Sequence, residues 1–153
     1  MATEIERKFL VTGAGWRSAA AVYYCQGYLN RDKHRTVRVR IAGSAAWLTI
    51  KGMAAGISRL EFEYPIPLED AQSLLELCQK PLIEKYRRVI EFEGKQWEVD
   101  EFLGENAGLI IAELELESEA ETFTLPDWVG KEVSHDPRYF NVSLSQHPFK
   151  DWK

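Results

Sequence analysis

Residues 3–11 read TEIERKFLV, and the character of the side chains alternates along them. Glu4, Glu6 and Lys8 share one parity, whereas the apolar Phe9 belongs to the other. Because successive side chains of a β-strand point to opposite faces, the three charged residues would line one side of a strand. The alternation therefore predicts a β-strand that carries charge along one face.

Seven further stretches have the composition of β-strands and are separated by turn signals. They span residues 22–30, 34–41, 46–51, 59–66, 82–92, 95–103 and 108–117. Eight strands joined by short turns predict a single antiparallel barrel or a strongly curved antiparallel sheet.

Two parts of the chain depart from the strand pattern. Over residues 67–80 the apolar side chains recur with the period of an amphipathic helix, with Pro81 just past its end. In the tail, LPDWVGKEV (residues 125–133) suggests a short helix, and DPRYFNVSLS (residues 136–145) suggests a final turn or helix. The expected fold class is α+β and is mainly antiparallel β.

The overall composition limits the classes of protein to which the chain can belong. Its net charge of −5 and its isoelectric point near 5.3 argue against a nucleic-acid-binding protein, which usually carries a basic excess. No run of about 18 apolar residues is present, and the charged N-terminus is unlike a secretory signal. Cys25 and Cys78 are too few for a disulfide framework or a metal-ligand cluster. We expect one cytoplasmic domain, residues 1–153, with no nucleic-acid or membrane partner.

Charges of the same sign recur two residues apart along one face of the predicted strands. The pairs are Glu4/Glu6, Arg38/Arg40, Glu61/Glu63, Lys85/Arg87 and Glu113/Glu115. A sheet with one hydrated face also alternates polar and apolar residues, but like charges at this spacing repel, and an ordinary hydrated face would mix the signs. If the sheet closes, these side chains line a lumen together with Lys8, Lys51 and Asp100.

The near balance of acids and bases indicates what a closed lumen would contain. Burying dry ions costs several kcal/mol per ion even when they are paired, so the lumen would be hydrated or filled by a ligand. Clusters of lysine and arginine bind phosphate oxygens, whereas clustered carboxylates bind hard cations such as Mg²⁺ or Mn²⁺. A chain of several phosphates with a bound divalent cation needs both kinds of group.

The order of these charged motifs resembles that of a known family. Glu4-Ile5-Glu6-Arg7-Lys8 has the form E-x-E-x-K, and later strands carry R-x-R, E-x-E, K-x-R and E-x-E in that order. The series resembles the CYTH superfamily, the triphosphate tunnel metalloenzymes, over roughly residues 2–145. This resemblance implies an eight-stranded closed β-barrel that encloses a tunnel, with helices packed outside. It also implies a triphosphate bound in the tunnel and metal-dependent hydrolysis of a phosphoanhydride bond.

The resemblance also implies roles for individual residues. The metal ligands would be Glu4, Glu6, Asp100, Glu113 and Glu115. The phosphate-binding residues would be Lys8, Arg38, Arg40, Lys51, Lys85 and Arg87. Glu61 and Glu63 match a further acidic pair, whose role is open between a second metal, the attacking water and charge balance. The catalytic set would combine Glu4, Glu6, Lys8, Glu61 and Glu63.

Two further candidates lie outside these motifs. Tyr28 shares its parity with Gln26 and would contact the substrate, unless it is a tyrosine of the barrel rim. The run that contains Arg138, Tyr139 and Asn141 resembles the C-terminal segment of the family, which either closes one tunnel mouth or is a structural cap.

The resemblance to the short bacterial members implies an inorganic triphosphatase. A chain of 153 residues shows no insert for nucleoside recognition, which favours tripolyphosphate, cleaved to pyrophosphate and phosphate with Mg²⁺ or Mn²⁺. The alternatives are a class IV-type adenylate cyclase, a thiamine-triphosphatase or a non-catalytic polyphosphate-binding module on the same scaffold. The sequence leaves open whether the protein is a monomer or a homodimer.

Overall fold

The fold is an antiparallel β-barrel with one helix on its outside and a C-terminal segment at one end. The computed structural model describes residues 2–152. In this range the strands are β1 (Thr3–Val11), β2 (Ala21–Asn30), β3 (Arg35–Ala42), β4 (Ala45–Gly52), β5 (Ser58–Pro65), β6 (Gln79–Phe92), β7 (Lys95–Phe102), β8 (Ile110–Glu115) and β9 (Val129–Glu132). The helices are α1 (Leu68–Leu77) and α2 (Asn141–Leu144), and single 3₁₀ turns lie at η1 (Gly15–Ser18), η2 (Gly104–Asn106), η3 (Pro137–Tyr139) and η4 (Phe149–Asp151). None of the helices in the described range is long and apolar enough to cross a membrane.

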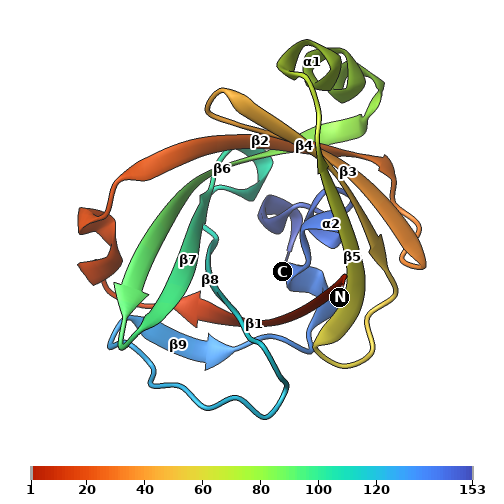
Figure 1. Cartoon of the computed structure of the whole chain (residues 1–153). Coiled ribbons are helices and arrows are strands. Elements are labelled where there is room, and N and C mark those ends of the chain that lie inside the picture. The colour runs from red at the N-terminus through yellow and green to blue at the C-terminus, as the bar shows by residue number, and fades with distance from the viewer. Residues whose placement is uncertain (1, 153) are drawn as a thin grey trace.

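Eight of the strands described in residues 2–152 close into a barrel (Figure 1). Along the sheet they follow the order β5-β4-β3-β2-β6-β7-β8-β1. The barrel closes where β1 pairs in antiparallel fashion with β5, with Thr3 opposite Leu60 and Ile5 opposite Ser58. The predicted eight-stranded antiparallel barrel is therefore confirmed.

The apolar faces of the strands mostly point away from the lumen and are covered from outside. One cluster packs outside β1, β7 and β8, and its buried members are Phe9, Trp16, Trp97, Val99, Ala112, Leu114 and Leu116. A second cluster lies beneath α1, where Ala71 and Leu75 pack with Val39 of β3. Burial of a large apolar side chain stabilises the fold by about 1.5–3 kcal/mol. The outer clusters therefore stabilise a barrel whose interior is polar.

A third apolar cluster closes one end of the lumen. Ile83, Phe102 and Ile111 have the strand parity of the charged residues, so their side chains point inward. They pack with Leu144 of α2, which is 0% exposed. Figure 1 shows α2 within the ring of strands. The prediction of helices outside the barrel thus holds for α1, whereas the C-terminal segment enters the barrel end because its apolar side chains are buried there.

The prediction of a helix over residues 125–133 is wrong. This stretch contains β9, which pairs with β1 through contacts such as Val129 opposite Val11. Because β5 pairs with β1 only over residues 3–5, the backbone groups further along this edge of β1 need other partners. β9 supplies these partners. Because this pairing joins residues far apart in the chain, the local sequence pattern does not indicate it.

The helix predicted over residues 67–80 is present but shorter. α1 ends at Leu77, and Cys78 already has an extended backbone, with a ψ of 152°. Gln79 then begins β6 and pairs with Tyr28 of β2. At the end of the predicted helix, pairing with β2 therefore determines the backbone conformation, and the chain forms a strand there.

Candidate active site

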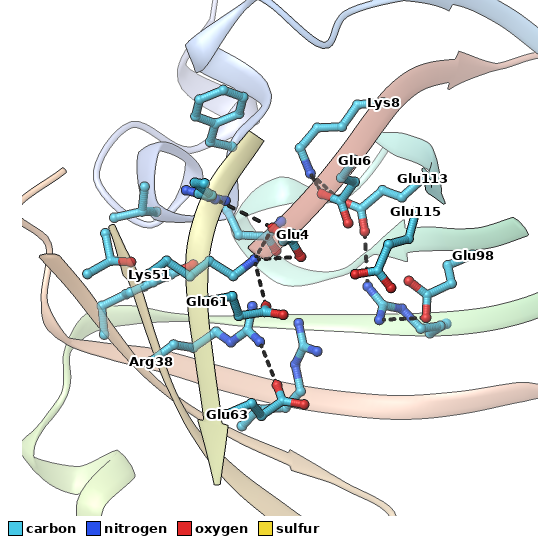
Figure 2. A pocket seen from close by; sticks show the side chains of 18 of the residues that line it. Glu4, Glu6, Lys8, Arg38, Lys51, Glu61, Glu63, Glu98, Glu113 and Glu115 are labelled. Carbon is cyan, nitrogen blue, oxygen red and sulfur yellow. Dashed lines mark hydrogen bonds and ion pairs between the residues drawn. The ribbon is translucent and has the colours of Figure 1, made fainter. Parts of the chain in front are cut away.

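The barrel encloses a polar cavity of about 160 Å³ (Figure 2). All eight barrel strands and the C-terminal segment contribute to its wall. Its acidic residues are Glu4, Glu6, Glu61, Glu63, Glu98, Glu113 and Glu115. Its basic residues are Lys8, Arg38, Arg40, Lys51, Arg59, Lys85 and Arg87. The remaining lining residues are Tyr28, Thr36, Phe140, Asn141 and Val142.

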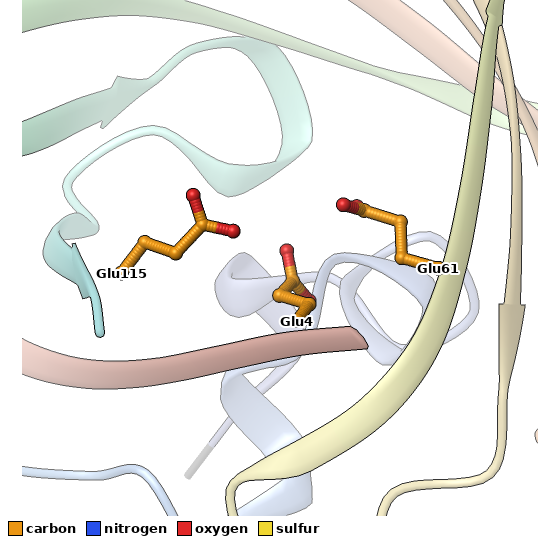
Figure 3. Close-up of side chains that lie close together, drawn as sticks. All are labelled: Glu4, Glu61 and Glu115. Carbon is orange, nitrogen blue, oxygen red and sulfur yellow. The ribbon is translucent and has the colours of Figure 1, made fainter. Parts of the chain in front are cut away.

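Three carboxylates from three strands meet in a first acidic group. Glu4 of β1, Glu61 of β5 and Glu115 of β8 each place an oxygen within 4.8 Å of the other two (Figure 3). Barrel closure produces this group, because β1 pairs with β8 along one edge and with β5 along the other. Carboxylate oxygens are the ligands that hard divalent cations such as Mg²⁺ prefer, so these residues fit a metal ion.

A second acidic group lies beside the first. Glu6 of β1, Glu98 of β7 and Glu113 of β8 also place oxygens within 4.8 Å of one another. Lys8 Nζ lies 3.0 Å from Glu6 Oε1 and contacts a carboxylate oxygen of Glu113. The first group also includes a lysine partner, because Lys51 Nζ lies 2.9 Å from Glu4 Oε1. Each acidic group is therefore partly neutralised by one lysine and one arginine, because Arg59 lies 3.5 Å from Glu4 and Arg87 lies 3.2 Å from both Glu98 and Glu113.

Asp100 is not part of either acidic group and does not line the cavity. It is 1% exposed, and its two oxygens accept hydrogen bonds from Arg87 at 2.7 and 2.8 Å. One of these oxygens also lies 2.6 Å from Lys85 Nζ. Because both of its oxygens contact cationic side chains, the geometry favours Asp100 as a partner of bases, and its sequence-based assignment as a metal ligand stays a prediction. Asp100 holds Arg87 and Lys85, and Glu98 of the same strand faces the cavity.

Arg38 presents a buried N–H group that lacks a partner among the described residues. The residue is 7% exposed, and its Nη2 lies 3.2 Å from Thr49 Oγ1 and 3.5 Å from Glu63 Oε2. Its Nε hydrogen-bonds to no residue within 2–152. Leaving a buried N–H unpaired costs about 1–3 kcal/mol, so this part of the wall favours a ligand with an acceptor such as a phosphate oxygen.

Burial weakens the ionisation of several acids in the cavity. Glu115 keeps an exposed side chain, yet partial desolvation raises its pKa to about 7, and repulsion from Glu4 and Glu61 adds to the effect. Burial also raises the pKa of Glu6 and of Glu98. A divalent cation bound among these carboxylates would favour their ionised forms and reverse the shifts.

The pKa values of two bases shift in the opposite direction for the same reason. Burial lowers the pKa of Lys85 to about 7 despite the attraction of Asp100. Burial also lowers the pKa of Arg40 to about 10, and the neighbouring Arg38 and Arg87 lower it further. A polyanion in the cavity would stabilise the protonated forms, so the basic side of the wall favours an anionic ligand.

The raised pKa of Glu115 predicts how stability depends on pH. With a pKa of about 7 against an ordinary value of 4.5, the folded protein binds more protons than the unfolded chain between these values. Stability should therefore fall as the pH rises from about 5 to about 7. Urea denaturation in the presence of EDTA should show that the free energy of unfolding decreases over this pH range. In Glu115→Gln the free energy of unfolding should depend less steeply on pH. Glu117→Gln, on the exposed continuation of the same strand, is the control, and an unchanged slope in Glu115→Gln would contradict the assignment.

All other residues that the sequence assigns to metal binding, phosphate binding or catalysis line this one cavity. Tyr28 lies among them and is 5% exposed. Their individual roles stay predictions, but their convergence follows directly from strand parity and barrel closure.

Some cavity residues are missing from the sequence-based set. Arg59 shares its parity with Glu61 on β5, so the alternation contains a signal for it. Glu98 likewise shares a face of β7 with Asp100. Phe140 and Val142 have no comparable signal, because they reach the cavity only through the return of the C-terminal segment to the barrel.

A model of the CYTH domain matches residues 2–147 of the chain. This range includes every residue that lines the cavity. The sequence is also similar to two curated proteins named inorganic triphosphatase. The protein from Acetivibrio thermocellus is 54% identical over 155 aligned positions, which cover 100% of this chain and 99% of the relative. The protein from Nitrosomonas europaea is 35% identical over 147 positions, which cover 94% of this chain and 97% of the relative.

Solved structures show the same architecture. A crystal structure of an inorganic triphosphatase superimposes with a TM-score of 0.69 at 34% identity and covers 95% of each chain. A suggested adenylate cyclase from Bacillus halodurans superimposes with a TM-score of 0.60 at 16% identity and covers 78% of this chain and 84% of that chain. At that identity the second likeness shows the fold alone.

Proposed function

The chain belongs to the CYTH domain family, and we propose that it hydrolyses inorganic triphosphate with the aid of a divalent cation. The observation that carries the proposal is the cavity, where two groups of three carboxylates face an array of lysine and arginine side chains. The name inorganic triphosphatase of a relative that is 54% identical over the whole chain supports the same substrate.

The basic side chains would bind the phosphates. Those predicted from the sequence are Lys8, Arg38, Arg40, Lys51, Lys85 and Arg87. Arginine can donate two parallel hydrogen bonds to a phosphate, whereas lysine acts as a compact charge with three donors. The unpaired Nε of Arg38 would gain an acceptor when a phosphate oxygen enters the cavity.

The two acidic groups would hold Mg²⁺ or Mn²⁺. When bound, such a cation acts as a Lewis acid toward phosphate oxygens and neutralises negative charge. Glu61 would serve the first acidic group. Glu63 accepts a hydrogen bond from Thr49 Oγ1 at 2.9 Å and lies 3.5 Å from Arg38, so we assign it to charge balance and to positioning of Arg38.

Hydrolysis would use one water molecule. Its oxygen forms a bond to phosphorus as the phosphoanhydride P–O bond breaks, and the products are pyrophosphate and phosphate. The contribution of the chain is to hold the polyanion in one geometry and to stabilise its charge, which supplies most of the rate in phosphoryl transfer.

Phosphate release from a panel of substrates tests the proposal. Tripolyphosphate, ATP, thiamine triphosphate and pyrophosphate should be compared with Mg²⁺, with Mn²⁺ and with EDTA. We expect tripolyphosphate to be the fastest substrate and EDTA to reduce its turnover by at least about a hundredfold. Cyclic AMP formed from ATP would favour a cyclase, and tight tripolyphosphate binding without phosphate release would favour a polyphosphate-binding module.

The cytoplasmic location and the single domain remain predictions from the sequence.

A further inference from the structure

Asn141 contacts the basic side of the cavity from the closed end of the barrel. Its Oδ1 accepts hydrogen bonds from Lys85 Nζ at 3.1 Å and from Gln26 Nε2 at 3.0 Å. Gln26 Oε1 in turn accepts a hydrogen bond from Arg40 Nε at 2.7 Å. Two neutral amides thus link a lysine of β6 to an arginine of β3, two strands that are not adjacent in the sheet.

The linked bases need partners that hold them without cancelling their charge. Lys85 Nζ lies 2.6 Å from Asp100, an attraction that draws the ammonium toward the barrel wall. An ammonium has three N–H donors. Asp100 and Asn141 can each accept one of them, which leaves the third donor for a phosphate oxygen. Asn141 therefore sets the direction in which that donor points.

The position of Asn141 is independently fixed by the rest of the C-terminal segment. It begins α2, whose Leu144 is 0% exposed in the apolar cluster at the barrel end. Arg31 donates hydrogen bonds to Ser145, at 2.8 Å to its carbonyl oxygen and at 3.1 Å to its hydroxyl oxygen. These contacts should keep α2 in place when the Asn141 side chain is changed.

We propose that Asn141 is a positioning residue for triphosphate binding, which acts by holding Lys85 directly and Arg40 through Gln26. This inference rests on the proposed function. The residue sets the array that receives the phosphates and stands apart from both acidic groups, so its loss weakens binding of substrate and transition state alike. Such a change raises KM and leaves kcat nearly constant.

Asn141→Leu tests the proposal, because leucine has a similar size and accepts no hydrogen bond. KM for tripolyphosphate should rise about tenfold, the loss expected for one hydrogen bond to a charged group, and kcat should stay within about threefold. Ser143→Ala is the matched control, because Ser143 lies in the same helix and does not line the tunnel cavity. The melting temperatures of both variants should remain close to that of the wild type.

A second background separates positioning from a structural role. In Lys85→Met the direct basic partner of Asn141 is absent and only the link through Gln26 to Arg40 remains, so adding Asn141→Leu should weaken binding by no more than about threefold. Calorimetric titration with tripolyphosphate in EDTA measures this without turnover. An equal tenfold loss in both backgrounds, or an unchanged KM in Asn141→Leu, would overturn the positioning role alone. Failure of the wild-type protein to hydrolyse tripolyphosphate with either Mg²⁺ or Mn²⁺ would overturn the proposed function as well.

Discussion

Replacement of Glu4 by glutamine should lower metal-dependent hydrolysis of tripolyphosphate about a thousandfold. Glu4 is 7% exposed and belongs to the first acidic group with Glu61 and Glu115. Glutamine keeps the size of the side chain but removes the negative charge that a hard cation requires. The loss should appear in kcat/KM at every Mg²⁺ concentration, together with a weaker affinity for Mn²⁺ in a direct titration.

Glu117→Gln is the control for this experiment. Glu117 follows Glu115 with the same parity and is also exposed, but unlike Glu115 it does not line the cavity. Its replacement removes the same charge and should leave the rate within about twofold of the wild type. Full metal-dependent turnover by Glu4→Gln would show that the first acidic group does not bind the essential cation.

Asp100→Asn should lower the free energy of unfolding by about 3 kcal/mol and leave the affinity for Mn²⁺ unchanged. Asp100 lies within hydrogen-bond distance of both Arg87 and Lys85, and it is almost fully buried. Without its charge, the buried Lys85 loses the carboxylate that lies 2.6 Å away, and Arg87 keeps only its contacts with Glu98 and Glu113 at 3.2 Å each. Tripolyphosphate supplies negative charge to the folded state only, so it should stabilise this variant more than the wild type in urea denaturation with EDTA.

Glu101→Gln provides the matched comparison on the neighbouring residue. Glu101 pairs with Arg88 at 3.0 Å and with Arg17 at 3.2 Å, and its side chain is 25% exposed. Ion pairs of this kind contribute little, so we expect its replacement to change the unfolding free energy by at most about 1 kcal/mol. A tenfold loss of Mn²⁺ affinity in Asp100→Asn would instead support the sequence-based assignment of Asp100 as a metal ligand.

The wall of the cavity could be predicted from the sequence because strand parity is a local property. A strand places residues two apart on one face whatever its partners are, so Glu4, Arg38 and Lys85 can be assigned to the same kind of surface before the strands are paired. The same rule contains a signal for Arg59, which shares the inward parity of Glu61. The tail has no such regular pattern, and the helix predicted for residues 125–133 failed because β1 pairs with this stretch.

The sequence could not decide which carboxylate of β7 joins an acidic group. Glu98 and Asp100 share one face of β7 and are equal candidates for metal binding by sequence. The register of β7 against β6 places Asp100 opposite Arg87, whereas its register against β8 places Glu98 opposite Glu113. Asp100 is therefore held by Arg87 and Lys85 away from the cavity, whereas Glu98 joins the second acidic group and also pairs with Arg87 at 3.2 Å.

The amino-acid sequence by itself determined the strands, the charged inner face and the family resemblance, because each depends on residues close together in the chain. Only the tertiary structure decided that β1 meets β5, that Asp100 holds bases, and that Asn141 reaches Lys85 from the far end of the chain. The physical reason is that these contacts depend on sheet register and on burial of the C-terminal segment. Both are set by the energy of the whole barrel, and no short stretch of sequence encodes them.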